Sequence, residues 1–285
     1  MRLCCSAGKV PNKAKQMPEE SQKKVTELME LYSTEKLEYT FKTNTDDTEQ
    51  LLEQAKQELK LDAQDAAAFD HLMAAKEAEI YGDEDAVLEN YNAVIQDGTT
   101  QQRYDALLGL SDYYAKEHDS EKAKEEADIA LDLLDVMYPD EDIKDNEQLK
   151  KKKAQLQAQI KAKKAAILQT EAGELNKKAS DLNDPKDSAE KAELEAKAKA
   201  LETEAKAEYK SAYELSGDPG LAAQYAILSC QGNPDASACV SEIVKTPADA
   251  SEATKATIEK QKQNVMKQLD IKKKQEELNN AKTPA

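Results

Sequence analysis

Apolar residues recur at steps of three and four between Tyr104 and Leu134, and this spacing is the strongest constraint on how the chain folds. Residues spaced in this way fall on one face of an α-helix. The pattern is interrupted once, at residues 117–120, where the sequence reads Glu-His-Asp-Ser. We therefore expect two antiparallel helices here. Their apolar positions are Leu107, Leu110, Tyr114, Ala123, Ala127, Ala130 and Leu134.

The composition favours helices along the rest of the chain as well. Leu, Ile, Val and Phe make up only about 17% of the 285 residues and the formal net charge is -17, values that are also found in disordered chains. However, Ala, Glu, Lys, Gln and Leu dominate, and all are strong helix formers. Residues that favour strands are too scarce to build a sheet. The sequence therefore predicts an all-α fold with a thin, alanine-rich core.

The hairpin at 104–135 resembles a tetratricopeptide repeat (TPR), a helical hairpin of about 34 residues. Its segment Leu107-x2-Leu110-Ser111-x2-Tyr114 falls where that family has Trp, Leu, Gly and Tyr, and Ala123-x3-Ala127 falls where it has Ala and Phe. The family's Trp, Gly, Phe and closing Pro are missing, so the resemblance is to the packing pattern. Residues 66–96, with a turn at Gly82, match the same pattern more loosely one period upstream. The resemblance implies TPR-like antiparallel hairpins stacked as an α-solenoid.

Breaks in the pattern divide the chain into four regions. Residues 1–18 are predicted to be a disordered tail, and 19–137 a TPR-like helical region that includes a helix starting at a capping box, Asp47 with Gln50. The acidic break at 138–142 opens a third region, 138–216, which reads as a long coiled-coil-like hairpin. Its helices are predicted at 146–182 and 187–215. The fourth region, 217–281, reads as a short hairpin, 221–231 and 235–245, followed by a closing helix at 250–279.

The TPR resemblance implies a non-catalytic scaffold that binds a peptide or helix of another protein on a concave surface. In that family the first helix of each hairpin lines this surface. The corresponding outward positions here are Lys76, Glu79, Asp105, Leu108, Asp112 and Lys116. The alternative is a structural spacer or assembly subunit that forms homo-oligomers through the long hairpin, whose alanine-rich seam favours close helix packing.

Charge and motif content argue against several other functions. The acidic balance and the two arginines disfavour a nucleic-acid surface and extensive contact with anionic membranes. The interspersed Lys, Glu and Asp are typical of solvated helix faces with i,i+4 ion pairs. The sequence contains no nucleotide-binding glycine loop and no HExxH motif. We therefore expect neither an enzyme nor a bound cofactor or metal ion.

Histidines and acidic clusters are the remaining candidates for chemistry, and both have simpler explanations. His118 falls in a predicted turn and His71 on a helix, and neither lies in a nucleophile motif. The acidic runs at 83–85 and 140–142 lack the alternating ligands and the glycine of a calcium loop. They are better explained by the preference of helix amino termini for negative charge.

Four cysteines bear on the compartment. Cys230 and Cys239 flank a Gly-Asn-Pro break, so they form either a local disulfide in an oxidising compartment or two buried thiols in the cytosol. Cys4 and Cys5, followed by lysines, resemble lipid-anchored segments but equally fit an unmodified tail. No apolar run is long enough to span a bilayer. The expected location is the cytoplasm, with a membrane-anchored or extracytoplasmic location as the alternative.

Overall fold

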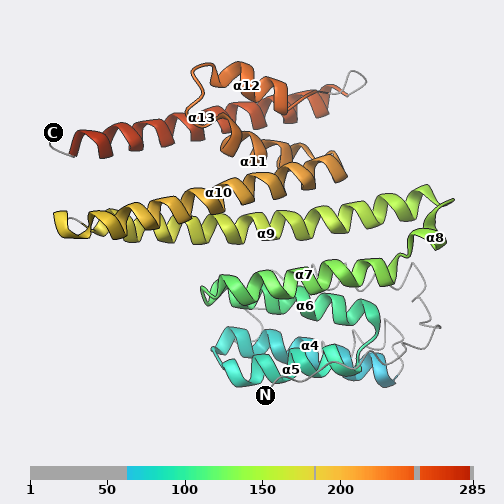
Figure 1. Cartoon of the computed structure of the whole chain (residues 1–285). Coiled ribbons are helices and arrows are strands. Elements are labelled where there is room, and N and C mark those ends of the chain that lie inside the picture. Colours follow the sequence, from blue (N-terminus) through green and yellow to red (C-terminus); the bar gives the residue numbers. More distant parts are fainter. Residues whose placement is uncertain (1–62, 183, 247–250, 283–285) are drawn as a thin grey trace. The chain divides into compact units, whose positions relative to one another are not determined.

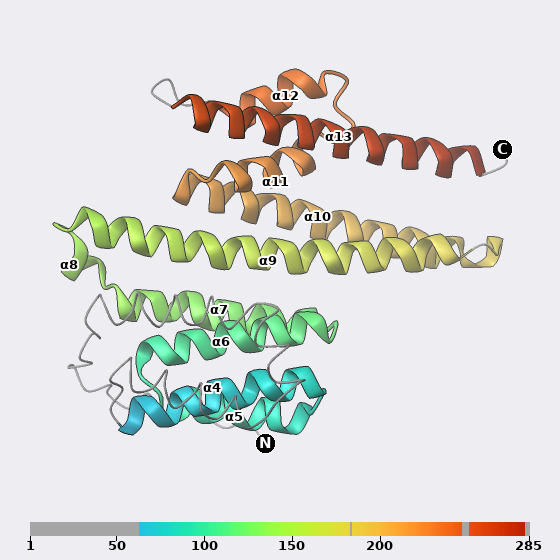
Figure 2. The same cartoon turned by 180° about the vertical axis from the view of Figure 1, so that it is seen from behind.

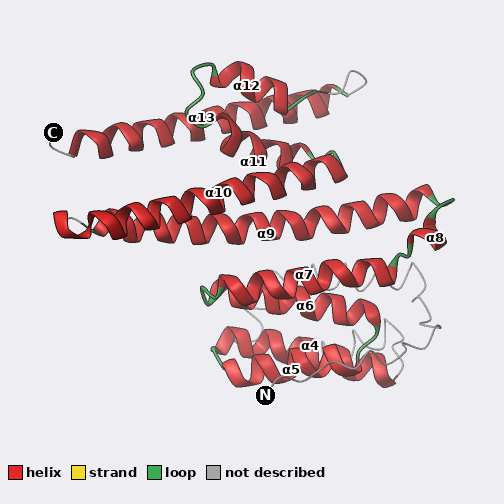
Figure 3. Ribbon diagram, in the orientation of Figure 1, coloured by secondary structure: helices red, strands yellow, loops and turns green. Residues whose placement is uncertain are grey.

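A computed structural model describes residues 63–182, 184–246 and 251–282 (Figure 1). Every element in these ranges is a helix, which confirms the predicted all-α class (Figure 3). The predicted tail at 1–18, the capping box at Asp47 and the pair Cys4 and Cys5 lie outside the described residues. The elements are α4 (Ala63–Tyr81), α5 (Glu84–Asp97), α6 (Thr100–Lys116), α7 (Ser120–Met137), α8 (Asp140–Ile143), α9 (Glu147–Asp181), the 3-10 turn η1 (Pro185–Asp187), α10 (Ser188–Ser216), α11 (Pro219–Cys230), α12 (Ala236–Ile243) and α13 (Glu252–Lys282).

Polar and glycine breaks end the helices close to where the sequence predicts. An aspartate precedes α5, α7 and α12 and accepts a hydrogen bond from the backbone N–H three residues ahead, which satisfies a donor that the helix leaves unpaired. Gly82 and Gly217 follow α4 and α10 with φ values of 72° and 67°, a conformation that other residues adopt only with strain. The predicted acidic break at 138–142 differs in one respect, because α8 begins inside it and ends just after it at the buried Ile143.

The chain divides into two compact units, Met1–Leu110 and Ser111–Ala285. In the described part of the first unit, α4 and α5 pack as a hairpin. Tyr91 of α5 is fully buried, and Gly109 of α6 lies against its ring: a Cβ atom on Gly109 would come within 2.5 Å of a Tyr91 ring carbon. Only a glycine at this position leaves room for the aromatic side chain.

The helices of the second unit pack as successive layers, and the contacts join helices that lie close together in the sequence. Helix α7 packs against α9, α9 against α10, α10 against α11, and α11 against both α12 and α13. Figures 1 and 2 show this order from opposite sides. Between α6 and α7, the buried Ser111 Oγ donates a hydrogen bond to the Ala123 carbonyl at 2.8 Å. Each layer thus positions the next.

Small residues form much of the core of the second unit. The long predicted hairpin corresponds to α9 and α10, whose buried alanines include Ala165, Ala172, Ala198 and Ala205. Alanine allows the two helix backbones to approach closely but buries little apolar area per residue. A second cluster joins α11, α12 and α13 around Ile227, Val240 and Val265.

Candidate partner-binding surface

Lys76 and Glu79, two of the residues predicted to bind a partner, are engaged within the first hairpin. Their ion pair is 2.9 Å long, and the Tyr91 hydroxyl donates a hydrogen bond to the Glu79 carboxylate at 2.6 Å. The Lys76 ammonium also lies 5.5 Å from the centre of the Tyr91 ring. The Glu79 side chain is only 7% exposed, so it does not point outward as the repeat register predicts. These contacts hold α5 against α4.

Asp105 and Leu108, two further predicted residues, are half-buried on α6. The Gln101 amide donates a hydrogen bond to the Asp105 carboxylate at 3.1 Å. Burial raises the pKa of Asp105 to about 7, although the Gln101 hydrogen bond acts in the opposite direction. Near neutral pH this carboxyl group is therefore poorly solvated and divided between its neutral and ionised forms.

Asp112 and Lys116, the last of the six, are exposed at the end of α6. Asp112 is ion-paired with Lys163 of α9. Its position therefore faces the next layer of the second unit, and its charge is already neutralised there.

Ion pairs join α9 to α7, and sequence reasoning missed them. Lys124 of α7 pairs with Glu171 of α9 at 3.0 Å, and Lys164 of α9 pairs with Asp128 of α7. The expected i,i+4 pairs also occur, for example Lys197 with Glu193. Lysine-rich α9 is thus not simply a solvated helix, because several of its ammonium groups hold neighbouring layers.

Lys153 is the most buried of the charged side chains on α9, with 9% of its side chain exposed. Its ammonium lies 2.8 Å from Asp135 of α7 and 2.7 Å from Asp140 of α8. Burial by itself would lower the pKa of Lys153, but the hydrogen bonds to the two carboxylates outweigh that effect and raise it. The lysine therefore stays charged and ties three helices together.

One face of α7 remains open after these contacts. Ile129 and Val136 are 45% and 56% exposed, and Leu133 lies half-buried between them. Glu125, Glu126 and Asp132 flank this apolar strip. We call these six residues the α7 face. Burial and the neighbouring Glu125 charge raise the pKa of Glu126, as expected where carboxylates lack a cation. Sequence reasoning missed this surface, although the helical spacing of Ile129 and Val136 is visible in the sequence.

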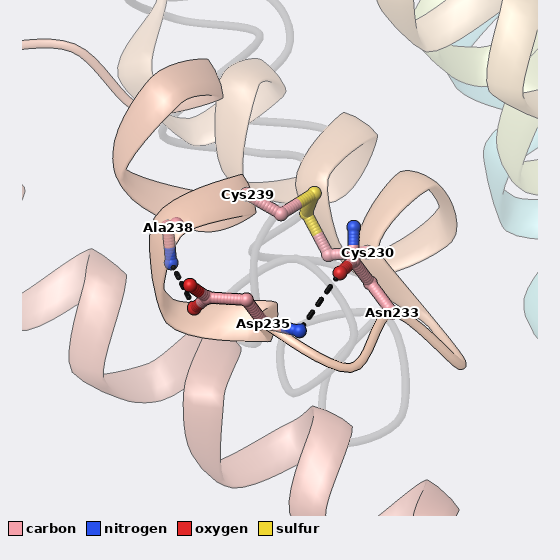
Figure 4. Close-up of a disulfide and its surroundings, with 5 residues drawn as sticks. All are labelled: Cys230, Asn233, Asp235, Ala238 and Cys239. Atoms are coloured by element: carbon pink, nitrogen blue, oxygen red, sulfur yellow. Dashed lines mark hydrogen bonds between the residues drawn. A yellow bond between two sulfur atoms is a disulfide. The ribbon is translucent and has the colours of Figure 1, made fainter.

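Cys230 and Cys239 are joined by a disulfide between α11 and α12, with Cα atoms 5.8 Å apart (Figure 4). Of the two alternatives left open by the sequence, the structure has the disulfide. The turn between the cysteines is held by the Asn233 side chain, which accepts a hydrogen bond from the Asp235 N–H at 2.9 Å. Asp235 in turn caps α12 through the Ala238 N–H, so the disulfide closes a turn that is already ordered by hydrogen bonds.

The histidines make ordinary side-chain contacts. His71 Nδ1 is 2.8 Å from the Asn90 amide oxygen, and His118, in the turn after α6, contacts Glu174 of α9. Within 63–182, 184–246 and 251–282, no group of three or more His, Cys, Asp or Glu side chains is arranged to hold a metal ion. A shallow groove of about 430 Å³ lies between α12 and α13 and is lined by both polar and apolar residues, among them Ser237, Val240 and Met266.

Comparisons of this sequence with protein-family models, with curated proteins and with solved structures give no match. None of the helices in the described ranges combines the length and the apolar character that crossing a bilayer requires.

Proposed function

We propose that this chain is a non-catalytic protein-interaction scaffold that binds a peptide or helix of a partner protein. The observation that carries the proposal is the pair Ile129 and Val136 on α7. Large apolar side chains are scarce in this sequence, and most of the described ones are buried. Two that are exposed lie one heptad apart on a single helix face, and contiguous exposed apolar surface is typical of an interaction site.

A partner helix or peptide suits the shape of this surface. The apolar strip follows the axis of α7, and an amphipathic helix places its own apolar residues at the same intervals of three, four and seven. Burying one side chain of this size stabilises a complex by about 1.5–3 kcal/mol relative to full exposure. The strip alone is smaller than a standard interface, so the partner must also contact neighbouring residues.

The positions derived from the TPR resemblance support the proposal less directly. The charges of Lys76, Glu79 and Asp112 are already paired within the chain. A partner that used them would have to break these pairs, which reduces the net gain on binding. The scaffold proposal therefore rests on the α7 face, not on the concave positions.

Self-association through the long hairpin has less support. The alanine seam that favoured it is buried between α9 and α10 of the same chain, as at Ala165 and Ala205, which pack in one cluster. It is thus not exposed for contact with a second copy. Sedimentation of the full chain at rising concentration tests this alternative, which requires a concentration-dependent oligomer.

The disulfide bears on the proposed location. Cytosolic thiols are kept reduced by glutathione and thioredoxin, whereas disulfides persist in oxidising compartments. The Cys230–Cys239 bond therefore favours the extracytoplasmic alternative over the cytoplasm. Mass spectrometry of alkylated protein from its native source tests this, and the same measurement shows whether Cys4 and Cys5 are acylated.

The scaffold proposal is tested by photo-crosslinking in the native cells. A photoreactive benzoylphenylalanine is placed at one position at a time, and adducts are identified by mass spectrometry. We expect a reproducible partner adduct from the α7 positions. If no position yields a protein adduct, the chain is not a scaffold of this kind. The positions are the exposed large apolar residues Tyr81, Ile129, Val136, Leu215 and Ile271.

A further inference from the structure

We propose that the α7 face binds a cationic amphipathic helix, so that the partner is recognised by a strip of apolar residues flanked by Lys or Arg. This inference rests on the scaffold function proposed above and specifies the chemistry of the partner. It depends on three features of α7: the geometry of its apolar strip, the contacts made by its other faces, and the charges that those contacts leave unpaired.

The apolar residues of the α7 face lie along one line. Seven residues make almost two full helical turns, so Ile129 and Val136 point in nearly the same direction, and Leu133 fills the turn between them. The strip therefore has the spacing of one half of a helix–helix seam. A facing helix supplies the other half by placing its own apolar side chains between these three.

Two other faces of α7 are already occupied. One face is buried, with Ala123 receiving the Ser111 hydrogen bond and Ala127 and Leu134 fully enclosed. A second face carries Asp128 and Asp135, whose ion pairs with α9 turn it toward that helix. The strip lies on neither face. No described helix layer therefore covers Ile129 and Val136, and both remain exposed.

Both lysines of α7 are already engaged in ion pairs. Lys122 pairs with Asp119 at 3.0 Å, and Lys124 pairs with Glu171 at 3.0 Å. In contrast, none of the acidic residues that flank the strip forms an ion pair with a described residue. These residues are Glu125, Glu126 and Asp132. The strip is thus bordered by uncompensated negative charge, which attracts a cationic partner and repels an anionic one.

The negative charge of the α7 face also favours one kind of binding partner over the others. A second copy of the chain would bring the same acidic flank and a formal charge of -17 against it, so self-pairing is opposed. Anionic lipid surfaces and nucleic acids are repelled for the same reason. A cationic amphipathic helix satisfies both halves of the surface at once, because its apolar side covers the strip while its basic residues reach the three carboxylates.

The experiment measures binding of a labelled 18-residue peptide of Leu and Lys, patterned as an amphipathic helix, to the full-length protein by fluorescence anisotropy. The double variant Ile129→Ala, Val136→Ala is expected to weaken binding about tenfold or more, because two central apolar contacts are lost. The triple variant Glu125→Gln, Glu126→Gln, Asp132→Asn is expected to weaken it by a similar factor and to flatten its dependence on salt. A Leu and Glu peptide with the same apolar pattern is expected not to bind.

Two matched controls separate the α7 face from the general negative charge of the protein. The double variant Leu215→Ala, Ile271→Ala removes two other exposed apolar side chains, one from α10 and one from α13. The triple variant Glu190→Gln, Glu195→Gln, Glu204→Gln removes the same charge from exposed positions on α10. Both controls are expected to bind the Leu and Lys peptide as the unaltered protein does. If either control weakens binding as much as its α7 counterpart, the inference is overturned.

The remaining outcomes distinguish this inference from the scaffold proposal. A cationic partner on α7 is rejected if the Leu and Lys peptide binds no better than the Leu and Glu peptide. It is also rejected if neither peptide binds. The scaffold proposal survives that result if photo-crosslinking still yields a partner adduct at another position. A change of oligomeric state in the Ile129→Ala, Val136→Ala protein, measured by sedimentation, would assign the face to a second copy and would also overturn the inference.

Discussion

The ammonium group of Lys153 on α9 lies 2.7 Å from a carboxylate oxygen of Asp140 at the start of α8, and 2.8 Å from one of Asp135 near the end of α7. Both carboxylates are largely exposed, whereas the lysine side chain is buried. The stem of Lys153 therefore packs in the interior while its charge reaches the surface to meet its partners. Substitutions of Lys153 can therefore distinguish the contribution of its packing to stability from that of its charge.

We predict that Lys153→Ala lowers the free energy of unfolding by about 2–3 kcal/mol, because it loses both the buried stem and the ion pairs. Lys153→Met keeps most of the packing, and the two exposed aspartates regain water, so its effect is expected to be about 1 kcal/mol or less. Urea denaturation followed by circular dichroism measures both. Lys151→Ala, at an exposed position on the same helix, is the control. Equal effects of Lys151→Ala and Lys153→Ala would show that neither the buried stem of Lys153 nor its ion pairs stabilise the fold.

Asp105 is predicted to make stability depend on pH. Its pKa is raised from 3.8 to about 7, so the folded state binds a proton more tightly than the unfolded state. The free energy of unfolding is thus expected to fall as the pH rises from about 4 to about 7. The fall is at most about 4 kcal/mol, because each tenfold change in proton affinity corresponds to about 1.4 kcal/mol. Asp105→Asn should remove this slope and be more stable than the unaltered protein at pH 8.

Urea denaturation at pH 5 and pH 8 tests the Asp105 prediction. Glu89→Gln, at an exposed position on α5, is the control and should keep the slope of the unaltered protein. An Asp105→Asn protein that retains the full slope would assign the pH dependence to other groups.

The glycines at 109 and 173 are predicted to respond to alanine in opposite directions. A Cβ atom at Gly109 would lie within 2.5 Å of the Tyr91 ring, so Gly109→Ala is expected to destabilise the protein by about 2 kcal/mol or more. Gly173 is exposed on α9 and a Cβ atom there has open space, so Gly173→Ala should stabilise by up to about 1 kcal/mol through its higher helix propensity. Thermal unfolding measures both. Similar shifts for the two variants would contradict the close packing at Tyr91.

Loss of the disulfide is predicted to destabilise the last helices of the chain. The Cys230–Cys239 bond closes a loop of about ten residues, for which chain entropy gives about 2–3 kcal/mol. The double variant Cys230→Ser, Cys239→Ser should therefore melt at a lower temperature, and a reducing agent should lower the melting temperature of the unaltered protein to a similar extent. The variant itself should not respond to the reducing agent. A melting temperature that is insensitive to both changes would show that the bond does not stabilise the fold.

The helix positions could be predicted from the sequence because the signals that start and end helices are local. Asp119 caps α7 with its own side chain, and Gly82 adopts a positive φ that glycine tolerates best. Neither feature depends on distant residues. The spacing of Ala123, Ala127 and Leu134 likewise identified a buried face of α7, since the period of a helix is the same in any protein.

The pairing of charged residues could not be predicted in this way. The sequence shows many lysines among acids, and local reasoning assigns them to i,i+4 pairs on solvated faces. Lys153, Lys163 and Lys164 instead pair with acids on other helices. Which lysines do so depends on the rotation of α9 against α7, and this rotation is set by packing between layers.

The candidate site, too, could be predicted only in part from the sequence. The sequence by itself determined the class of fold, most of the places where helices begin and end, and the apolar period of α7, because these follow from local backbone chemistry and helix geometry. Only the tertiary structure decided that Glu79 turns inward to Tyr91, and that Ile129 and Val136 remain uncovered. Exposure and ion pairing depend on which elements pack together, and contacts between residues far apart in the chain leave no local pattern in the sequence.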